Sequence, residues 1–504
     1  MQERSSVVEL AEQLRRELDR YSPGGKLPSS RALVERFRVS PVTVSRALAQ
    51  LAAEGLVVTR PGAGAFRARP RTTAATTVGD TSWQEVALSA DGAADLVPRS
   101  VDASGVLVSL AAPPPAVIEF NGGYLHPSLQ PERAMSAALA RAGRRPGAWG
   151  RPPMEGLPEL REWFARGIAG PGGGVTAAEV LISSGGQAAL TTALRALAPP
   201  GAPVLVESPT YPGMLAIARA AGLRPVPVPV DAQGVRPSLL ADAFRATGAR
   251  VFVCQPLFQN PTGAVLAPDR RGEVLGIARA AGAFVVEDDF VRRLVHEDAG
   301  PVPRPLAADD PDGVVVHVGS LTKATSPSFR VSALAARGPV LERLRAIQVV
   351  DSFFVPRPLQ EAALELVGSP AWPRHLRAIS AELKARRDVM TAALRLGLPD
   401  LSLPHIPSGG YHLWLRLPDG TGGTSQAFGS GGEAALTAAA LRAGVAITPG
   451  RPYFSAEPSA GHVRLSFAAV AGAGEIAEGV RRLRAAYDEV VPDQVRRAAR
   501  TTLG

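Results

Sequence analysis

From residue 119 onward, short apolar runs alternate with stretches of helical pattern, and this alternation constrains the fold more than any other feature. The runs VLISS, APVLVES, ARVFVCQ, AFVVEDD and GVVVHVGS have the length of strands, and helical stretches separate most of them. Continuous apolar strands between helices are typical of a parallel sheet covered on both faces. The sequence therefore predicts an α/β fold with a mostly parallel sheet.

The end of the chain predicts a smaller α+β subdomain. Past Pro373 a long Arg-rich helical stretch leads to GGYHLWLRL and HVRLSFA, in which apolar and polar residues alternate. Alternation with a period of two favours strands with one buried face. We expect a large domain over residues 119–372 and a small C-terminal subdomain over residues 373–504.

The first 70 residues predict three helices followed by a β-ribbon. Apolar residues between Val7 and Tyr21 recur three and four positions apart, as on one face of a helix. Ser29 and Ser30 are suited to cap a second helix, and Ser40-Pro41 is suited to open a third. LVVTRPGAGAFRA then has the pattern of two short strands around a turn. This order predicts a winged helix-turn-helix over residues 1–70.

A linker is predicted between the two parts. Residues 71–118 are rich in Ala, Thr, Ser, Gly and Pro, a composition typical of extended, semi-stiff connections. A weak helix at Gln84–Ser89 is the one element assigned there. Trp83 and Leu88 suggest that part of the linker docks on a neighbouring surface.

The charge of the N-terminal part favours DNA as a partner. The net charge is +9, and more than half of the excess lies in residues 1–70, where 12 basic residues face seven acidic ones. A solvated basic face is the alternative explanation for such an excess. In a winged helix, the third helix (Pro41 to Glu54) would enter the major groove. The side chains expected to contact double-stranded DNA are Arg31, Ser40, Thr43, Ser45, Arg46 and Arg60.

The segment GGKLPSSRALVERFRVSPVTVSRALAQLAAEGLVVTRPGAGAF closely resembles the DNA-binding domain of the GntR family of bacterial regulators. The match includes the GxxLPSxRxL start, the VSxxTVxxAL core and the wing from LxxEGLV to GxGxF. Pro41 departs from this family, which usually has an arginine that contacts DNA at that position. The resemblance implies an operator-binding protein, with a protein-binding winged helix as the alternative.

Five motifs follow the predicted strands at their carboxyl ends, where open α/β sheets bind ligands. They are SGGQ, ESPTYPG, QNPTG, EDDF and GSLTKATSPSFR. Taken singly, each is explained by caps, turns or surface charges. Together they supply backbone N–H groups for a phosphate, an aromatic ring, an amide, a carboxylate and a lysine. Pyridoxal phosphate needs this set, because a lysine must bind it and a carboxylate must keep its ring nitrogen protonated.

Lysine is rare in the chain, which makes one position stand out. Only three of the 55 basic residues are lysines, namely Lys26, Lys323 and Lys384. Arginine replaces lysine wherever a positive charge is enough, but it cannot act as a neutral nucleophilic amine. Lys323 lies in the motif after the last predicted strand, where the cofactor lysine is required.

Residues 119–490 resemble the fold-type I aminotransferases of the aspartate aminotransferase superfamily. The resemblance implies that Lys323 forms the Schiff base with pyridoxal 5'-phosphate and that Asp288 partners its pyridine nitrogen. It implies that Asn260 contacts the ring oxygen and that Tyr211 stacks on the ring. Arg464 matches the arginine that binds a substrate carboxylate. The phosphate site implied by the resemblance consists of Gly185, Gly186, Gln187, Ser320 and Arg330.

A winged helix, a linker and an aminotransferase-like domain, in this order, resemble the MocR subfamily of GntR regulators. Two positions depart from the pattern, because Phe290 and Trp149 stand where such proteins usually carry tyrosines. Each change removes a hydroxyl and keeps an aromatic ring. A hydrogen bond is worth about 0.5–1.5 kcal/mol, so we expect weaker cofactor binding and a sensor rather than a fast catalyst.

The resemblance implies a homodimeric transcription regulator that senses pyridoxal phosphate or an amino-acid effector. Each DNA-binding module is expected to lie over the core of its partner, as in a domain-swapped dimer. Two alternatives stay open: a catalytically active aminotransferase with an accessory DNA-binding arm, and a DNA-binding repressor whose core is a dimerisation scaffold.

A cytoplasmic location is expected from three features of the chain. No apolar run approaches the roughly 18 residues of a membrane span. The first residues include Glu3, Arg4 and Glu9, where a signal peptide would need an apolar stretch. The lone Cys254 cannot form an internal disulfide. No metal site is expected.

Overall fold

The computed structural model describes residues 2–60, 63–68, 103–110, 114–169, 174–418, 430–458 and 460–491. They form two compact units, one before and one after residue 92. The helix expected at Gln84–Ser89, with Trp83 and Leu88, lies outside the described residues. None of the helices in these ranges combines the length and the apolar character that crossing a bilayer requires.

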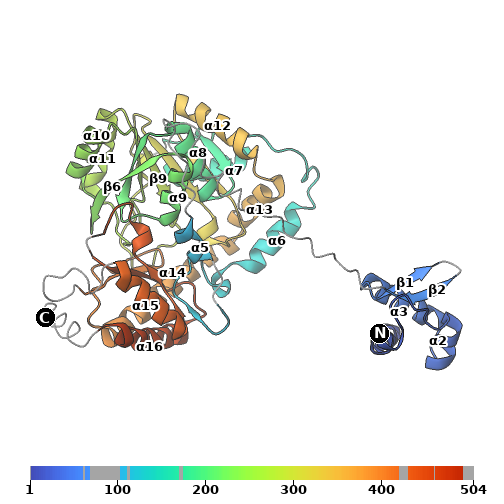
Figure 1. Ribbon diagram of the computed structural model, residues 1–504. Coiled ribbons are helices and arrows are strands. Elements are labelled where there is room, and N and C mark those ends of the chain that lie inside the picture. Colours follow the sequence, from blue (N-terminus) through green and yellow to red (C-terminus); the bar gives the residue numbers. More distant parts are fainter. Residues whose placement is uncertain are drawn as a thin grey trace, which may run out of the picture. The chain divides into compact units, whose positions relative to one another are not determined.

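The N-terminal unit is a cluster of helices with a two-stranded antiparallel sheet (Figure 1). Its core contains Leu14, Leu33, Val44 and Leu51, which come from all three α-helices. The elements are α1 (Gln2–Glu17), η1 (Leu18–Arg20), α2 (Ser30–Phe37), α3 (Pro41–Ala53), β1 (Val57–Arg60) and β2 (Gly64–Arg67).

The predicted helix starts of this unit are confirmed by its caps. Ser29 Oγ accepts a hydrogen bond from the Ala32 N–H at 3.2 Å, which caps α2. Ser40 Oγ accepts one from the Thr43 N–H at 3.1 Å, and Pro41 occupies the first turn of α3. Both serines satisfy backbone donors that a helix start leaves free.

The C-terminal unit is built on an eight-stranded sheet with the order β4-β11-β10-β9-β8-β5-β6-β7. β11 and β7 run antiparallel to their neighbours and the other strand pairs are parallel, which confirms the predicted mostly parallel sheet. The strands are β4 (Val180–Ser183), β5 (Pro203–Ser208), β6 (Arg224–Asp231), β7 (Gly234–Val235), β8 (Val251–Cys254), β9 (Phe284–Asp289), β10 (Val315–Ser320) and β11 (Ser332–Ala335).

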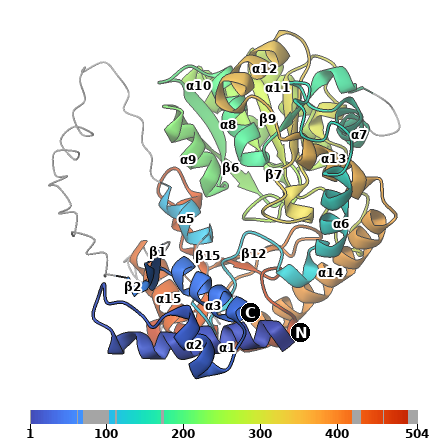
Figure 2. The same cartoon turned by 90° about the vertical axis from the view of Figure 1, so that its right-hand side faces the viewer.

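Helices cover both faces of this sheet (Figure 2). Along β5, Val204 and Val206 pack into one apolar cluster, whereas Leu205 between them packs into the other. Successive side chains of a strand point to opposite faces, so a strand covered on both sides must be apolar throughout. The helices are α7 (Pro158–Ala169), α8 (Gly186–Leu197), α9 (Pro212–Ala220), α10 (Pro237–Thr247), α11 (Pro268–Ala280), α12 (Pro339–Ser352) and α13 (Arg357–Val367).

A second, smaller group of strands and helices completes this unit. β12 (His412–Arg416), β15 (His462–Ser466) and β14 (Thr448–Pro449) form an antiparallel sheet. β13 (Val445–Ala446) pairs with β3 (Ile118–Glu119), which comes more than 300 residues earlier in the sequence. The remaining elements are α6 (Glu132–Ala142), α14 (Ala371–Gly397), α15 (Ser430–Arg442), α16 (Ala473–Val490), η2 (Pro127–Leu129), η4 (Ala177–Glu179), η5 (Leu306–Ala308), η6 (Thr322–Ala324) and η7 (Arg451–Tyr453).

The predicted linker contains a helix that the sequence analysis did not assign. α5 (Ser104–Leu110) lies within residues 71–118 and belongs to the C-terminal unit. A Cβ added at Gly105 would lie 2.9 Å from Pro452 Cβ and 3.3 Å from Pro212 Cβ, so α5 packs closely against the start of α9. This part of the linker is therefore a fixed element of the unit.

Candidate functional sites

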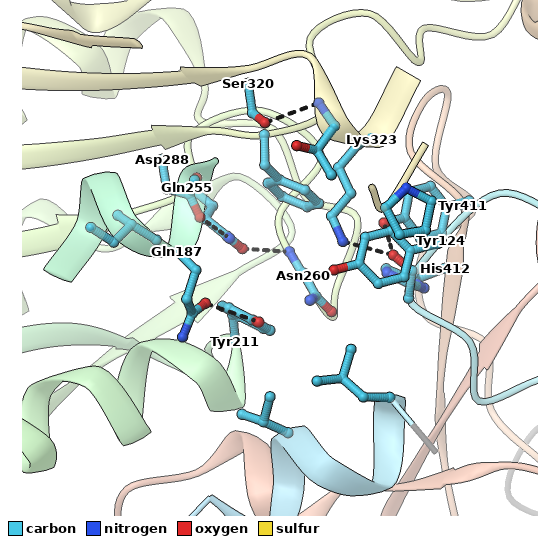
Figure 3. A pocket seen from close by; sticks show the side chains of 18 of the residues that line it. Tyr124, Gln187, Tyr211, Gln255, Asn260, Asp288, Ser320, Lys323, Tyr411 and His412 are labelled. Atoms are coloured by element: carbon cyan, nitrogen blue, oxygen red, sulfur yellow. Dashed lines mark hydrogen bonds between the residues drawn. The ribbon is translucent and has the colours of Figure 1, made fainter. Parts of the chain in front are cut away.

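A cavity of about 520 Å³ lies at the carboxyl ends of the parallel strands. Most of the residues predicted from the sequence line it, and the side chains of Lys323, Asn260 and Tyr211 face the same space (Figure 3). The predicted residues in its wall are Lys323, Asp288, Asn260, Tyr211, Gly186, Gln187, Ser320, Arg330 and Arg464. Gly185 lies beside it, behind the guanidinium of Arg330.

Lys323 stands in η6, directly after the end of β10. Its Nζ donates a hydrogen bond to the Gly123 carbonyl at 2.7 Å and lies 3.8 Å from the centre of the Tyr124 ring. Burial, and then the positive charge of Arg464, lower the pKa of Lys323 to about 7. A large fraction of this lysine is therefore a neutral amine at neutral pH, the form that attacks a carbonyl.

Asp288 is the last residue but one of β9 and is buried at the floor of the cavity. Burial raises its pKa to about 6, and a hydrogen bond of 2.6 Å from Gln255 Nε2 to Asp288 Oδ2 opposes that rise. The same Gln255 side chain accepts a hydrogen bond from the Asn260 N–H at 2.9 Å. One amide therefore ties the carboxylate of Asp288 to the loop that carries Asn260 (Figure 3).

Asn260 presents an unsatisfied group at this floor. Its Oδ1 is buried and has no hydrogen-bond partner in the described part of the chain. A buried amide oxygen without a partner is costly, so a polar ligand group is the expected partner. Sequence reasoning found Asn260, but it missed Gln255, whose role depends on a contact with Asp288 on another strand.

A candidate anion-binding site lies at the start of α8. Gly185 is the N-cap with a φ of +88°, and Gly186 is the first residue of a 12-residue helix. A Cβ at Gly185 would lie 2.5 Å from Arg330 Cζ, so only glycine lets the guanidinium approach the helix start. Arg330 donates to the Ser184 carbonyl at 3.3 Å and forms no ion pair with a described residue. A helix N-terminus beside an unpaired guanidinium suits a phosphate.

Two aromatic side chains flank the floor. Tyr211 is the N-cap of α9, and its hydroxyl lies 3.4 Å from Gln187 Oε1. A Cβ at Gly213 would lie 2.3 Å from the Tyr211 ring, which shows how tightly the ring is held. Tyr411, which sequence reasoning missed, donates from its hydroxyl to the Gly123 carbonyl at 2.7 Å.

Arg464, which stands on β15, lines the other end of the cavity. Its side chain is 3% exposed, and its Nη2 donates to the Asn121 carbonyl at 2.7 Å. Nε has no partner among the described residues, and the described partners of the other two nitrogens are backbone carbonyls, a hydroxyl and an imidazole, with no carboxylate among them. His412 Nε2 lies 3.5 Å from Nη1, and burial lowers the pKa of His412 well below its usual value. A buried cation of this kind lacks only an anion, which a ligand carboxylate can supply.

The two aromatic departures fall in different places. Phe290 lines the cavity and keeps an aromatic wall without a hydroxyl. Trp149 lies between α6 and α7, and its side chain is 82% exposed. The structure therefore gives Trp149 no contact with the cavity of its own chain.

In the N-terminal unit, α2 and α3 form the helix-turn-helix and β1–β2 the wing. Ser45 and Arg46 are exposed on α3, and the exposed Arg60 lies 5.1 Å from the Phe66 ring centre. Arg31 is exposed and pairs with Glu35 at 3.6 Å. Thr43, by contrast, is buried, and its Oγ1 bonds to Ser40 Oγ at 2.8 Å. The contacts of these residues with DNA stay predictions.

Known proteins resemble both units of the chain. Residues 120–483 match the family of class I and II aminotransferases, and residues 7–66 match the gntR family of bacterial regulatory proteins. The HTH-type transcriptional regulator YdcR of Escherichia coli is 28% identical over 89% of this chain and 92% of its own. The 2-aminoadipate transaminase of Thermus thermophilus is 31% identical over 73% of this chain and 89% of its own.

Among solved structures, the α-aminoadipate aminotransferase LysN of Thermus thermophilus, complexed with N-(5'-phosphopyridoxyl)-L-leucine, superposes with a TM-score of 0.68. It is 29% identical, and the match covers 77% of this chain and 96% of that one. The chain thus belongs to the class I and II aminotransferase family. With its gntR domain it is a MocR-type transcriptional regulator, and its fold implies pyridoxal 5'-phosphate as the cofactor.

Gln255→Leu is expected to weaken cofactor binding about tenfold and to raise the pH below which binding is lost. Ionised Asp288 is the form that holds a protonated ring nitrogen, and its pKa is about 6, so binding falls as the pH drops through that value. The Gln255 donor favours the ionised form. Its loss therefore moves the midpoint to higher pH, because a hydrogen bond to a charged group is worth about 1.5–3 kcal/mol.

The measurement is binding of pyridoxamine 5'-phosphate from about pH 5 to about pH 8 in a Lys323→Ala background, which removes the titration of the lysine amine. Gln255→Glu is the control of similar shape. If Gln255 acts as a donor, the pH midpoint of binding is lowest with the native Gln255, higher in Gln255→Leu and highest in Gln255→Glu. Equal midpoints for the three residues would show that Gln255 only fills space.

Proposed function

We propose that this regulator binds pyridoxal 5'-phosphate covalently at Lys323 and that ligand chemistry at this site controls its binding to DNA. The observation that carries the proposal is the cavity itself. A lysine with a pKa of about 7 faces a buried carboxylate, between two arginines that have no carboxylate partner in the described residues. A mere dimerisation scaffold has no need of these unpaired charges, which are costly to bury.

Each of these cavity residues has a proposed role in binding the cofactor. Pyridoxal 5'-phosphate supplies an aldehyde that bonds to an amine and a ring that accepts electrons. Asp288 would hold the ring nitrogen protonated, Asn260 would contact the ring oxygen, and Tyr211 would stack on the ring. The phosphate would lie at the start of α8, held by Gly185, Gly186, Gln187, Ser320 and Arg330.

The effector would be pyridoxal phosphate itself or an amino acid. Arg464 would bind the carboxylate of the amino acid, whose amine would then compete with Lys323 for the cofactor. α5 lies in this wall of the cavity and is the first described element after residues 69–102, so the site is directly connected to the chain that leads to the DNA-binding unit. A change at the site would reach DNA binding through this connection.

We propose a homodimer, with each DNA-binding unit placed over its partner's core. Trp149, Val350 and Phe353 are large, exposed apolar side chains, which contact with a second copy would remove from water. Two copies present two helix-turn-helix units, which suits a repeated or palindromic operator. The proposed DNA contacts are Arg31, Ser40, Ser45, Arg46 and Arg60, with Thr43 as part of the cap; such a protein acts in the cytoplasm.

A second candidate function is transamination. Lys323, Asp288 and Arg464 line one cavity, and nothing more is needed in principle for amino-group transfer. Repeated turnover with an amino donor and a keto acid would support this function. A single response without turnover would support sensing.

The test uses the full chain loaded with cofactor and a random-sequence duplex library. Wild type is expected to enrich a duplex, and a mixture of L-amino acids should change its retention of that duplex. Arg46→Ala should lose the enrichment, whereas Arg16→Ala, an equal charge removal at an exposed site on α1, should keep it. Lys323→Ala should keep the DNA binding and lose the response to amino acids. Retention that responds neither to amino acids nor to removal of the cofactor would refute the sensing role.

A further inference from the structure

The part of the cavity wall that α5 contributes is apolar. Val106 and Leu110 both line the cavity, and they stand four residues apart, which places them on one face of the helix. Leu110 is 56% exposed, so much of its surface is available to a ligand. The whole helix, SGVLVSL, carries no charged side chain.

The position of α5 relative to the rest of the site is fixed by close packing. Gly105 abuts Pro452 and Pro212, and no larger residue would fit there without a shift. Pro212 directly follows Tyr211, which lines the same cavity. Val106 and Leu110 are thereby held near the ring-stacking tyrosine.

Each positively charged side chain of the cavity already has a role in the proposed function. Among the described residues that line it, the cations are Lys323, Arg330 and Arg464. The proposed function uses them for the cofactor carbonyl, the phosphate and the α-carboxylate. The one carboxylate in the wall, Asp288, lies at the floor in a hydrogen bond with Gln255. Within the lining of this cavity, an acidic or basic ligand side chain would therefore find no charged partner that is still free.

We infer that the effector site selects an α-amino acid with an uncharged, apolar side chain, and that Val106 and Leu110 are the specificity-determining residues. This inference rests on the proposed function, since the ligand must bind to the cofactor and to Arg464. A charged side chain placed against Val106 and Leu110 would lose part of its water without gaining a charged partner in the cavity wall. One methylene in an apolar pocket changes discrimination by about tenfold or more, so the preference should be measurable.

The experiment titrates the cofactor-loaded full chain with L-leucine and L-glutamate and follows the visible spectrum of the cofactor. Wild type is expected to bind L-leucine at least about tenfold more tightly than L-glutamate. Leu110→Arg should weaken the binding of L-leucine and strengthen the binding of L-glutamate. The ratio of the two affinities should shift by about tenfold or more. Leu107→Arg is the matched control, because Leu107 is on the same helix, 63% exposed, and does not line the cavity. It should leave the ratio unchanged.

The outcomes separate the inference from the proposed function. A cofactor band with a preference for L-glutamate in wild type, or an equal shift in both arginine variants, overturns the inference alone. A protein with no cofactor band in any variant overturns the proposed function, and the inference fails with it.

Discussion

Arg464→Ala is expected to abolish the response to amino acids while the cofactor stays bound to Lys323. The guanidinium of Arg464 is buried and has no carboxylate partner in the described part of the chain, so a ligand carboxylate would be its main partner. Removing one member of a buried charge pair costs about 2–5 kcal/mol. The affinity for an amino acid should therefore fall by at least about 30-fold.

The measurement is a spectral titration with L-amino acids, beginning from the cofactor-loaded protein. Arg464→Lys is the control, because it keeps the positive charge and loses the bidentate hydrogen bonding of a guanidinium. It should therefore recover part of the affinity for the amino acid. An unchanged cofactor band in both variants shows that the site is folded. Amino-acid affinity equal to that of wild type in Arg464→Ala would contradict the role of Arg464.

Arg330→Ala should lower the affinity for the cofactor by about 10- to 100-fold, because a hydrogen bond to a charged group is worth about 1.5–3 kcal/mol. Arg330 lies against Gly185 at the start of α8, where a phosphate would meet both the guanidinium and the helix N–H groups. The remaining affinity would come from those N–H groups and from Lys323.

Equilibrium dialysis of pyridoxal 5'-phosphate measures this loss directly. Pyridoxal without its phosphate provides the comparison, because Arg330→Ala should weaken its binding far less. Arg330→Lys should fall between wild type and alanine. A variant that loses both ligands equally would instead point to damage of the whole site.

Local patterns predicted most of the fold and most of the site. The apolar runs that became β4, β5, β8, β9 and β10 are buried on both faces, so apolar residues make up most of them. The buried Glu287 and His317 are exceptions, and they pair with each other across β9 and β10 at 2.9 Å. The site residues follow these strands at one edge of the sheet, so the order of motifs along the chain was enough to bring them together. Lys323 was found because lysine is rare in this chain.

β6 could not be recognised from its residues. RPVPVPVD contains prolines at every second position, and proline argues against a strand. Alternate N–H groups of a strand point to opposite sides, so Pro225, Pro227 and Pro229 remove donors from one side only. The valines between them keep the donors on the other side, toward β5. Only the position of β6 near the edge of the sheet makes this pattern acceptable.

Contacts between distant segments account for the other misses. α5 lies in a stretch with the composition of a linker, and its packing against Pro212 and Pro452 is visible only in three dimensions. Gln255 matters because β8 and β9 are neighbours, which places its amide 2.6 Å from Asp288.

The most direct test of the central claim is to locate the cofactor on the chain. The protein is loaded with pyridoxal 5'-phosphate, treated with borohydride to make the lysine linkage permanent, digested and mapped by mass spectrometry. With three lysines in the whole chain, the result is unambiguous. The account predicts a visible absorption band before reduction and a modified Lys323 after it, both absent from Lys323→Ala. No band in wild type, or a modification confined to Lys26 or Lys384, would contradict it.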